Sequence, residues 1–433
     1  MATARVLAGS LIASLLVIAL GPAGAPAQET AVDHAIALHQ RLARRNPFDA
    51  RPYLRLADAY IQKGRETGDV SYLGLAEQAL RKSLELAPDN GATVRHLAHV
   101  FATRHEFPEA ATQAARAIEL DPGDAGAYGV LGDAYLELGR YDRAGEAYDK
   151  MLRLREDLAS FGRSSGLKHL RGDVPGAIED LRRAVAWGEA NRQPRESIAW
   201  AQSQLGAEHL AVGELEAAQA QQLAALRTFP GYHRALAGLA QVRVAQGRYD
   251  EGAELYGKAL AVAPLPEYAV ALGDLYTKIG RRPEAAKQYD LVQYIGRLNT
   301  LNEVLYNREL AYFYADHDIK LEVAVELARK ELELRQDIYA HDLLAWSLHK
   351  AGRSREALAP MAEALHLGTL DAKLFFHAGM IHHAVGNHER AREYLTRALS
   401  TNRHFHVLQS AVAERVLDQL AVAAEQAPDT VRR

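Results

Sequence analysis

Two short patterns in the chain have the residue types of a reaction centre. Residues 162–166 read Gly-Arg-Ser-Ser-Gly and match G-x-S-x-G, the pattern that presents a nucleophilic serine in many hydrolases. That chemistry needs a sharp turn between a strand and a helix, because only such a turn exposes the serine hydroxyl. Here the match falls inside an expected helix with no strand before it. We therefore interpret the two glycines as loosening a helix, not as a catalytic turn.

Histidine is the second candidate, and metal binding is the chemistry to consider. Ten of the 18 histidines lie between His317 and His406, including a DHD pattern at 316–318 and the neighbours His382 and His383. A metal ion needs three or four converging ligands, whereas consecutive residues of a helix point about 100° apart. The patterns H-E-x-x-H, Walker A and G-x-G-x-x-G do not occur in the sequence. We expect no catalytic residue, no cofactor and no metal site, and we expect these histidines to pack or to line a groove.

Composition places the chain among folded globular proteins. It has 433 residues, of which 48% are hydrophobic and 24% charged, and its formal net charge is -4. This charge argues against a nucleic-acid partner, which would need a basic stripe. The chain has no cysteine, which excludes disulfides, thiolate metal sites and thiol nucleophiles.

Residues 1–27 have the features of a secretory signal peptide. Arg5 precedes an apolar run at 6–20, and Ala-Pro-Ala at 25–27 is a small-x-small cleavage site. We expect cleavage after Ala27, export to the periplasm or the extracellular face of a bacterial envelope, and no stable membrane anchor afterwards. The alternative is an uncleaved anchor, although the run is shorter than the ~20 residues that span a bilayer.

A segment that occurs nearly twice points to the elements that build the rest of the chain. GDAYLELGRYDRA covers residues 132–144, and GDLYTKIGRRPEA covers residues 273–285. Each has a small residue, an aromatic residue three positions later, a glycine four positions after that, and an alanine five further on. The spacing recurs from ten starting points, which are Ala50, Gly91, Ala125, Leu158, Ala199, His233, Pro266, Val304, Ile338 and Ala372. Positions 8 and 20 of the copies are small, with position 20 of the eighth copy ambiguous between Val323 and Ala324.

This spacing resembles that of the tetratricopeptide repeat family, whose unit is a 34-residue pair of helices. The resemblance runs from about residue 31 to 405 and implies an all-α, right-handed α-solenoid of about ten helix-turn-helix repeats with capping helices at both ends. After the signal peptide we expect a half-repeat capping helix at 28–49 and repeats 1–4 at 50–190. A loop at 191–198 that can act as a hinge, repeats 5–10 at 199–405, and a capping helix with a tail at 406–433 complete the chain.

The resemblance also implies a binding face, because the first helix of each hairpin lines an open concave groove in this family. Positions 2, 5, 9 and 12 of repeats 8 to 10 carry aromatic anchors, a methionine and charged groups. These predicted partner-binding residues are Arg308, Tyr312, Tyr339, Asp342, Trp346, His349, Phe376, Met380 and His383. A secondary basic groove is expected at Arg51, Arg55, Arg95 and His99. The alternative for Trp346 and Phe376 is that they only support hairpin packing.

The expected function is a non-enzymatic protein–protein interaction scaffold of the bacterial cell envelope, which binds a peptide or protein in the concave groove. One alternative is a periplasmic assembly chaperone or adaptor for a secreted or cofactor-bearing client. The other is a metal-binding protein that uses the histidine-rich C-terminal third.

Overall fold

The computed structural model describes residues 30–69, 71–301 and 307–426, and these ranges contain helices and no strand. The expected signal peptide at 1–27 lies outside the described residues. Among the described helices, none has the length and apolar character needed to cross a membrane.

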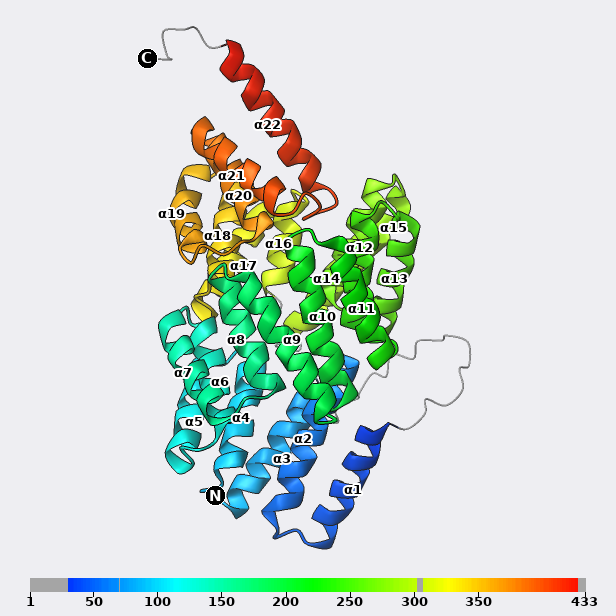
Figure 1. Cartoon of the computed structure of the whole chain (residues 1–433), viewed down its shortest axis with the longest axis vertical. Helices are drawn as coiled ribbons and strands as arrows, with labels where there is room; N and C mark the ends of the chain where they lie inside the picture. Colours follow the sequence, from blue (N-terminus) through cyan, green and yellow to red (C-terminus); the bar gives the residue numbers. More distant parts are fainter. Residues whose placement is uncertain (1–29, 70, 302–306, 427–433) are drawn as a thin grey trace, which may run out of the picture.

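Consecutive helices pair into hairpins that stack along the array (Figure 1). The first helices of the ten hairpins are α2 (Ala50–Thr67), α4 (Gly91–Thr103), α6 (Ala125–Glu137), α8 (Leu158–Leu170), α10 (Arg195–Ala211), α12 (His233–Ala245), α14 (Pro266–Lys278), α16 (Asn307–Asp316), α18 (Ile338–Lys350) and α20 (Ala372–Ala384). The second helices are α3 (Ser71–Leu86), α5 (Phe107–Leu120), α7 (Tyr141–Leu154), α9 (Val174–Ala190), α11 (Leu215–Thr228), α13 (Tyr249–Val262), α15 (Arg282–Leu301), α17 (Leu321–Leu334), α19 (Ser354–Leu365) and α21 (His388–Thr401). With α1 (Ala31–Arg45) and α22 (Gln409–Gln426) as caps, the expected all-α solenoid is confirmed.

The small residues of the repeat lie where the two helices of a hairpin cross. A Cβ atom added to Gly132 would lie 2.3 Å from the ring of Tyr148, and one added to Gly273 would lie 2.4 Å from the ring of Tyr289. In the eighth repeat Ala324 is fully buried, so it takes position 20 and resolves the ambiguity with Val323. Close helix crossings therefore account for the small residues that recur in the sequence.

The two helices beside the expected loop are longer than most others, with 17 residues each in α9 and α10. The loop expected at 191–198 covers only residues 191–194, because α9 extends to Ala190 and α10 already begins at Arg195. Pro194 stands directly before this first turn, where its fixed φ and missing N–H do no harm. Across this loop α9 packs against α10 as neighbouring repeats do elsewhere in the array.

Successive turns of the superhelix contact each other. The hydroxyl of Tyr141 accepts the backbone N–H of Ile338 at 2.8 Å, a contact between residues 197 positions apart. Thr369 donates to the carbonyl oxygen of Leu170, 199 positions away. With 34 residues in a repeat, one superhelical turn takes about six repeats. The expected open groove is thus corrected, because repeats 8 to 10 close over repeats 3 to 5.

Two turn glycines allow the superhelical turns to approach closely, and both also have a backbone conformation that favours glycine. Gly139 and Gly172 end the first helices of their hairpins with φ of 68° and 75°, a region that glycine adopts without steric cost. A Cβ atom at Gly139 would lie 2.3 Å from the carbonyl oxygen of Gln336 in the next turn, and one at Gly172 would lie 2.7 Å from that of Gly368. The hairpin turns therefore dock with direct backbone contact.

Candidate functional site

The segment between α21 and α22, residues 402–408, enters the concave side of the array, and we call it the connector. The loops before α8, α14 and α18 have three residues each, whereas the connector has seven. The capping helix expected from His406 begins only at Gln409, so His406 belongs to the connector.

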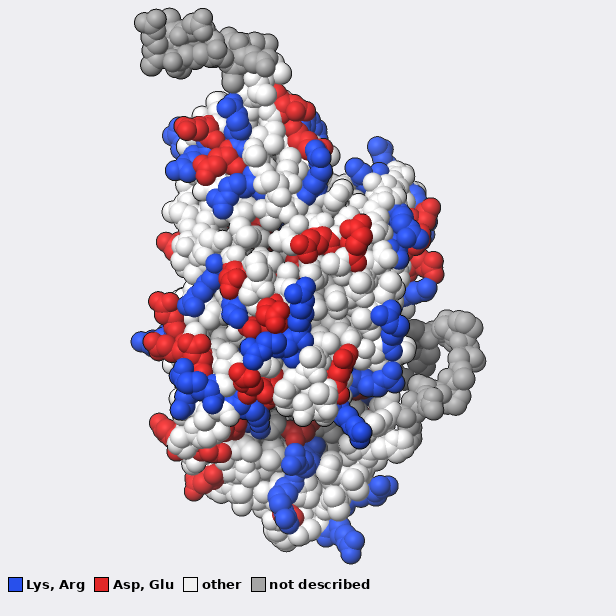
Figure 2. Space-filling model, viewed as in Figure 1, with Lys and Arg blue, Asp and Glu red and all other residues white. Residues whose placement is uncertain are grey.

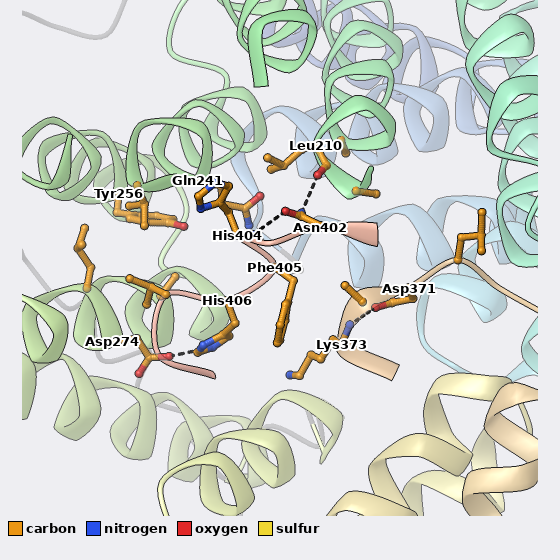
Figure 3. Close-up of a pocket in the computed structure, with 18 of the residues that line it drawn as sticks. Leu210, Gln241, Tyr256, Asp274, Asp371, Lys373, Asn402, His404, Phe405 and His406 are labelled. Atoms are coloured by element: carbon orange, nitrogen blue, oxygen red, sulfur yellow. Dashed lines mark hydrogen bonds and ion pairs between the residues drawn. The ribbon is translucent and has the colours of Figure 1, made fainter. Parts of the chain in front are cut away.

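Beside the connector lies a cavity of about 310 Å³, which we call the chamber (Figure 3). Its walls come from α8, α10, α12, α14 and the start of α20, and His404, Phe405 and His406 of the connector complete it. Gln241 and Tyr256 add polar groups beside apolar side chains. Five first helices, Tyr256 of α13 and the connector therefore converge on one cavity.

Asp274 on α14 is the centre of a buried hydrogen-bond network in the chamber wall. Its Oδ1 accepts the hydroxyl of Tyr289 at 2.8 Å and lies 2.7 Å from Nε2 of His317. Its Oδ2 lies 3.3 Å from Nε2 of His406. Burial by itself would raise the pKa of Asp274, but the hydrogen bonds from the two histidines hold it well below the ordinary value of 3.8. Asp274 is therefore a carboxylate that holds α14, α16 and the connector together.

The two histidines that contact Asp274 differ in the hydrogen bond at their other ring nitrogen. Nδ1 of His406 accepts the backbone N–H of Leu408, so a proton on Nε2 donates to Asp274. Both nitrogens of His317 face acceptors, the carbonyl oxygen of Phe313 at 2.8 Å and Asp274, so this ring carries two protons. Burial opposes that charge, yet Asp274 raises the pKa of His317 above its ordinary value of 6.5.

Asp316 at the end of α16 ties three other elements to the same interior. Its Oδ1 accepts the indole N–H of Trp346 at 2.8 Å and the amide of Gln409 at 2.7 Å. The ammonium of Lys373 lies 3.4 Å from Oδ2 and 4.3 Å from the ring centroid of Tyr312. Burial acts to lower the pKa of Lys373, but the carboxylates around it raise that pKa above its ordinary value of 10.5.

Asp342 is the third buried carboxylate of this interior. It accepts the hydroxyl of Tyr312 at 2.7 Å and lies 2.8 Å from Nδ1 of His377. The His377 ring stacks on Trp346 with 4.0 Å between the ring centroids. The predicted groove face of repeats 8 to 10 is thus a set of charged and aromatic side chains that bind one another.

The structure brings the predicted C-terminal groove residues together but covers the main ones. Trp346, Phe376 and Asp342 are only 3%, 2% and 1% exposed. The ring of Phe405 lies 5.5 Å from that of Phe376, which in turn lies 5.7 Å from Trp346. The expectation that Trp346 and Phe376 are exposed anchors is therefore corrected. They are core residues here, because Phe405 of the connector packs on Phe376 and Trp346 stacks on His377 and donates to Asp316.

The remaining predicted C-terminal residues are half-buried. Arg308 forms ion pairs with Glu331 at 3.1 Å and Asp337 at 2.9 Å. His349 stacks on Trp346 with 5.1 Å between ring centroids. The half-buried members without an ion pair of their own are Tyr312, Tyr339, His349, Met380 and His383.

The predicted basic groove at the N-terminal end is more accessible. The side chains of Arg51 and Arg55 are 85% and 68% exposed. Arg95 donates to Asp124 at 2.8 Å and is less exposed. Burial, and then the nearby Arg163, lower the pKa of His99 to about 4, so this histidine is neutral at pH 7.

Sequence reasoning missed the residues that form the chamber network. Asp274 was visible as the aspartate of the repeated Gly-Asp segment, and Asp316 and His317 as the DHD pattern. Only the fold shows that Asp316 faces α18 and α20 whereas His317 faces α14. Nothing in the sequence pattern places His406 beside them, because the connector interrupts the repeat.

The two patterns considered for catalysis and metal binding both lie in the described part of the chain. Ser164 and Ser165 are buried inside α8, as a helical interpretation requires. Across the described ranges, no group of three or more His, Asp or Glu side chains is placed to hold a metal ion. On the face shown in Figure 2, basic and acidic side chains are interspersed over most of the helices.

Family models match several of the repeats. A family model described as tetratricopeptide repeat matches residues 96–159, 204–264 and 237–297, and a second model with the same description matches residues 372–405. Tetratricopeptide repeat protein 37 of Xenopus laevis is 25% identical in an alignment of 309 residues that covers 67% of this chain. The chain spans only 18% of the length of that relative.

One solved structure shows a similar fold at low sequence identity. A human IFIT1 dimer with PPP-AAAA superposes with a TM-score of 0.51 at 17% identity, covering 78% of this chain and 77% of that one. Yeast Tom70 aligns over 92% of this chain and 94% of its own, with a TM-score of 0.39 at 14% identity. From the matched segments and the stacked hairpins, we conclude that this chain contains tetratricopeptide repeats arranged as an α-solenoid.

Proposed function

We propose that the chain is a non-enzymatic interaction scaffold of a bacterial cell envelope, and that it binds a peptide or protein segment inside its superhelix. The chamber carries this proposal, because side chains from repeats 4 to 7 and 10 converge on one cavity of about 310 Å³. Apolar walls with a few convergent polar groups are what binding pockets share. The tetratricopeptide repeats support an interaction role, since repeat arrays of this kind present extended concave surfaces to partners.

The envelope location rests on the N-terminal sequence. Arg5, the apolar run at 6–20 and the Ala-Pro-Ala at 25–27 support export with cleavage after Ala27. Mass spectrometry of the chain recovered from a periplasmic fraction tests this part directly. A mature chain that begins at Gln28 supports it, whereas recovery of the intact N-terminus from the cytoplasm contradicts it.

Capture from a periplasmic extract tests the binding role. Gln241 lines the chamber and is exposed to it, so Gln241→Arg places bulk and charge inside the cavity without disturbing the core. Gln78 lies exposed on α3, away from the chamber, and Gln78→Arg is the matched control. We expect partners bound by the wild type and by Gln78→Arg to be lost with Gln241→Arg. Equal recovery on all three chains contradicts the chamber as the binding site.

A further inference from the structure

The connector makes contacts that a short link between two helices does not need. It is longer than the three-residue loops before α8, α14 and α18, and its additional length runs inward. Its side chains reach first helices of three different repeats, which lie in two successive turns of the superhelix. These anchoring contacts are Asn402 Nδ2 to the Leu210 carbonyl at 2.7 Å, Phe405 to Phe376 at 5.5 Å between ring centroids, and His406 Nε2 to Asp274 at 3.3 Å.

This arrangement is that of a ligand bound across a concave repeat surface. The connector crosses this surface in two turns, at 403–404 and 407–408. A bound peptide gains specificity from side chains that enter separate pockets, while hydrogen bonds fix its register. Asn402 is 6% exposed and also accepts the N–H of His404 at 2.8 Å, so the first anchor is buried and both polar atoms of its side chain are hydrogen-bonded. Figure 3 shows His404, Phe405 and His406 following it along the chamber. The connector therefore occupies the surface that we assign to a partner.

The charges of the two sides are complementary. The connector carries hydrogen-bond donors, and the surface around it carries carboxylates. The connector donors at this surface are Asn402, His404 and His406, and the carboxylates are Asp274, Asp316 and Asp371. Lys373 of the same surface pairs with Asp316 at 3.4 Å, so the carboxylates still outnumber the cation. A segment with donor side chains on both sides of an aromatic ring matches this surface, whereas an acidic segment would face like charges.

The geometry points to the connector as an internal competitor for a peptide partner of the same chemistry. That partner has an amide side chain, an aromatic ring three residues later, and a hydrogen-bond donor at the next position. The inference rests on the proposed function and adds the class of partner and its regulation. A partner enters only when the connector leaves, and α22, whose outer end projects beyond the array, moves with it (Figure 1).

A synthetic peptide with the connector sequence, NRHFHVL, tests this inference by fluorescence anisotropy with the full mature chain. A tethered segment competes at an effective concentration on the order of mM, so the wild type is expected to bind the free peptide weakly. The double variant Asn402→Ala/Phe405→Ala removes two anchors of the connector and leaves every residue of the helices around it unchanged. We expect this variant to bind the peptide at least ~10-fold more tightly than the wild type, because the internal competitor is weakened.

Arg403→Ala is the matched control within the same connector. The Arg403 side chain is 71% exposed and pairs with Glu414 at 3.1 Å, outside the chamber. This variant is expected to bind the peptide as weakly as the wild type. The peptide NRHAHVL, which lacks the aromatic ring, is expected to lose the gain in affinity on the double variant. Equal affinity of NRHFHVL for all three chains overturns the inference.

Hydrogen exchange on the wild type gives a test that does not depend on the folding of a variant. The backbone N–H groups of His404 and Gln409 donate to the connector side chains of Asn402 and His406. Excess NRHFHVL is expected to speed hydrogen exchange at both N–H groups. If the peptide binds while these amides keep their protection, the connector is not displaced and the inference is wrong. If the amides keep their protection but Gln241→Arg still loses its captured partners, the inference fails and the proposed function stands. If the peptide displaces the connector but no partner is captured by the wild type, the proposed function fails and the competition is still shown.

Discussion

The nearly repeated segments at 132–144 and 273–285 fold alike within their hairpins and meet different surroundings. In both, a glycine packs on the tyrosine of the partner helix, and that tyrosine donates to the aspartate of the segment, at 2.9 Å for Asp133 and 2.8 Å for Asp274. Asp133 then receives the guanidinium of Arg163 from the next first helix, at 2.8 Å. Asp274 receives two histidines instead, one of them from the connector.

The turn glycines of the two segments differ in the same way. Gly139 and Gly280 have φ of 68° and 78°, so both adopt the left-handed conformation that ends the helix. Gly139 touches the backbone of the next superhelical turn at Gln336, whereas the space around Gly280 is open. The repeat sequence therefore specifies the structure of the hairpin. The position of the hairpin in the superhelix decides what surrounds the residues that the two segments share.

The largest difference in stability is expected between alanine substitutions of these two glycines. Gly280→Ala should cost ~1–2 kcal/mol, because alanine is strained in the left-handed region. Gly139→Ala should cost a further ~1–3 kcal/mol, since its Cβ would overlap the carbonyl oxygen of Gln336 and force the two turns apart. Urea denaturation measures both costs. Equal costs would mean that the turns do not dock in solution.

The second largest effect should be a difference in stability cost between substitutions of the two aspartates, Asp133 and Asp274. Asp133→Asn leaves the guanidinium of Arg163 without its carboxylate. Losing one partner of a buried pair costs ~3–5 kcal/mol, and partial exposure of this pair reduces the expected cost to ~2–3 kcal/mol. Asp274→Asn should cost only ~1 kcal/mol near pH 8, because His317 can release its proton when the carboxylate is gone. The same denaturation experiment decides, and a larger cost for Asp274→Asn would contradict the assigned charge of His317.

A third pair of variants should lose the same amount of stability. Gly132→Ala and Gly273→Ala each place a Cβ atom against the tyrosine ring of their own hairpin, at 2.3 and 2.4 Å. Overpacking costs ~1–3 kcal/mol and is partly offset by a gain of ~1 kcal/mol in helix propensity, so both variants should lose ~1 kcal/mol. Unequal melting temperatures would show that the two hairpins are not locally equivalent.

The smallest effect is in the titration of the histidines beside the two aspartates. His317 has a raised pKa, so its contribution to stability is complete below pH 6.5 and is lost as the pH rises through its folded pKa. Asp274 has a lowered pKa, so its contribution is present above pH 3.8 and is lost as the pH falls through its folded pKa. The pair should therefore stabilise the fold most between about pH 4 and 6.5.

His99, which lies near Asp133 and Arg163, should behave in the opposite way. Its pKa is lowered to about 4, so the neutral ring is favoured, and its protonation destabilises the fold as the pH falls from 6.5. Proton NMR of the imidazole C–H groups should show His317 titrating above pH 6.5 and His99 near pH 4. Similar titration midpoints for His317 and His99 would contradict the expected difference between the surroundings of Asp274 and Asp133.

Much of the fold could be predicted from sequence because it depends on local spacing. Small residues at positions 8 and 20, aromatic residues beside them and glycine at the turn specify each hairpin without reference to distant parts of the chain. Ala324 shows the limit of this reasoning, since Val323 fitted the pattern equally well until its exposure was known. The candidate site was harder to predict, because Trp346 and Phe376 lie on the predicted face and are nevertheless covered.

The sequence by itself determined the hairpins, their number and the helix faces that turn inward, because contacts between neighbouring helices repeat every 34 residues. Only the tertiary structure decided which of those faces remain open. Contacts such as Tyr141 with Ile338 and Asn402 with Leu210 join residues nearly 200 positions apart, and they depend on the small rotation that each repeat adds to the one before. No local pattern records that accumulated rotation, so the closure of the superhelix and the entry of the connector appear only in three dimensions.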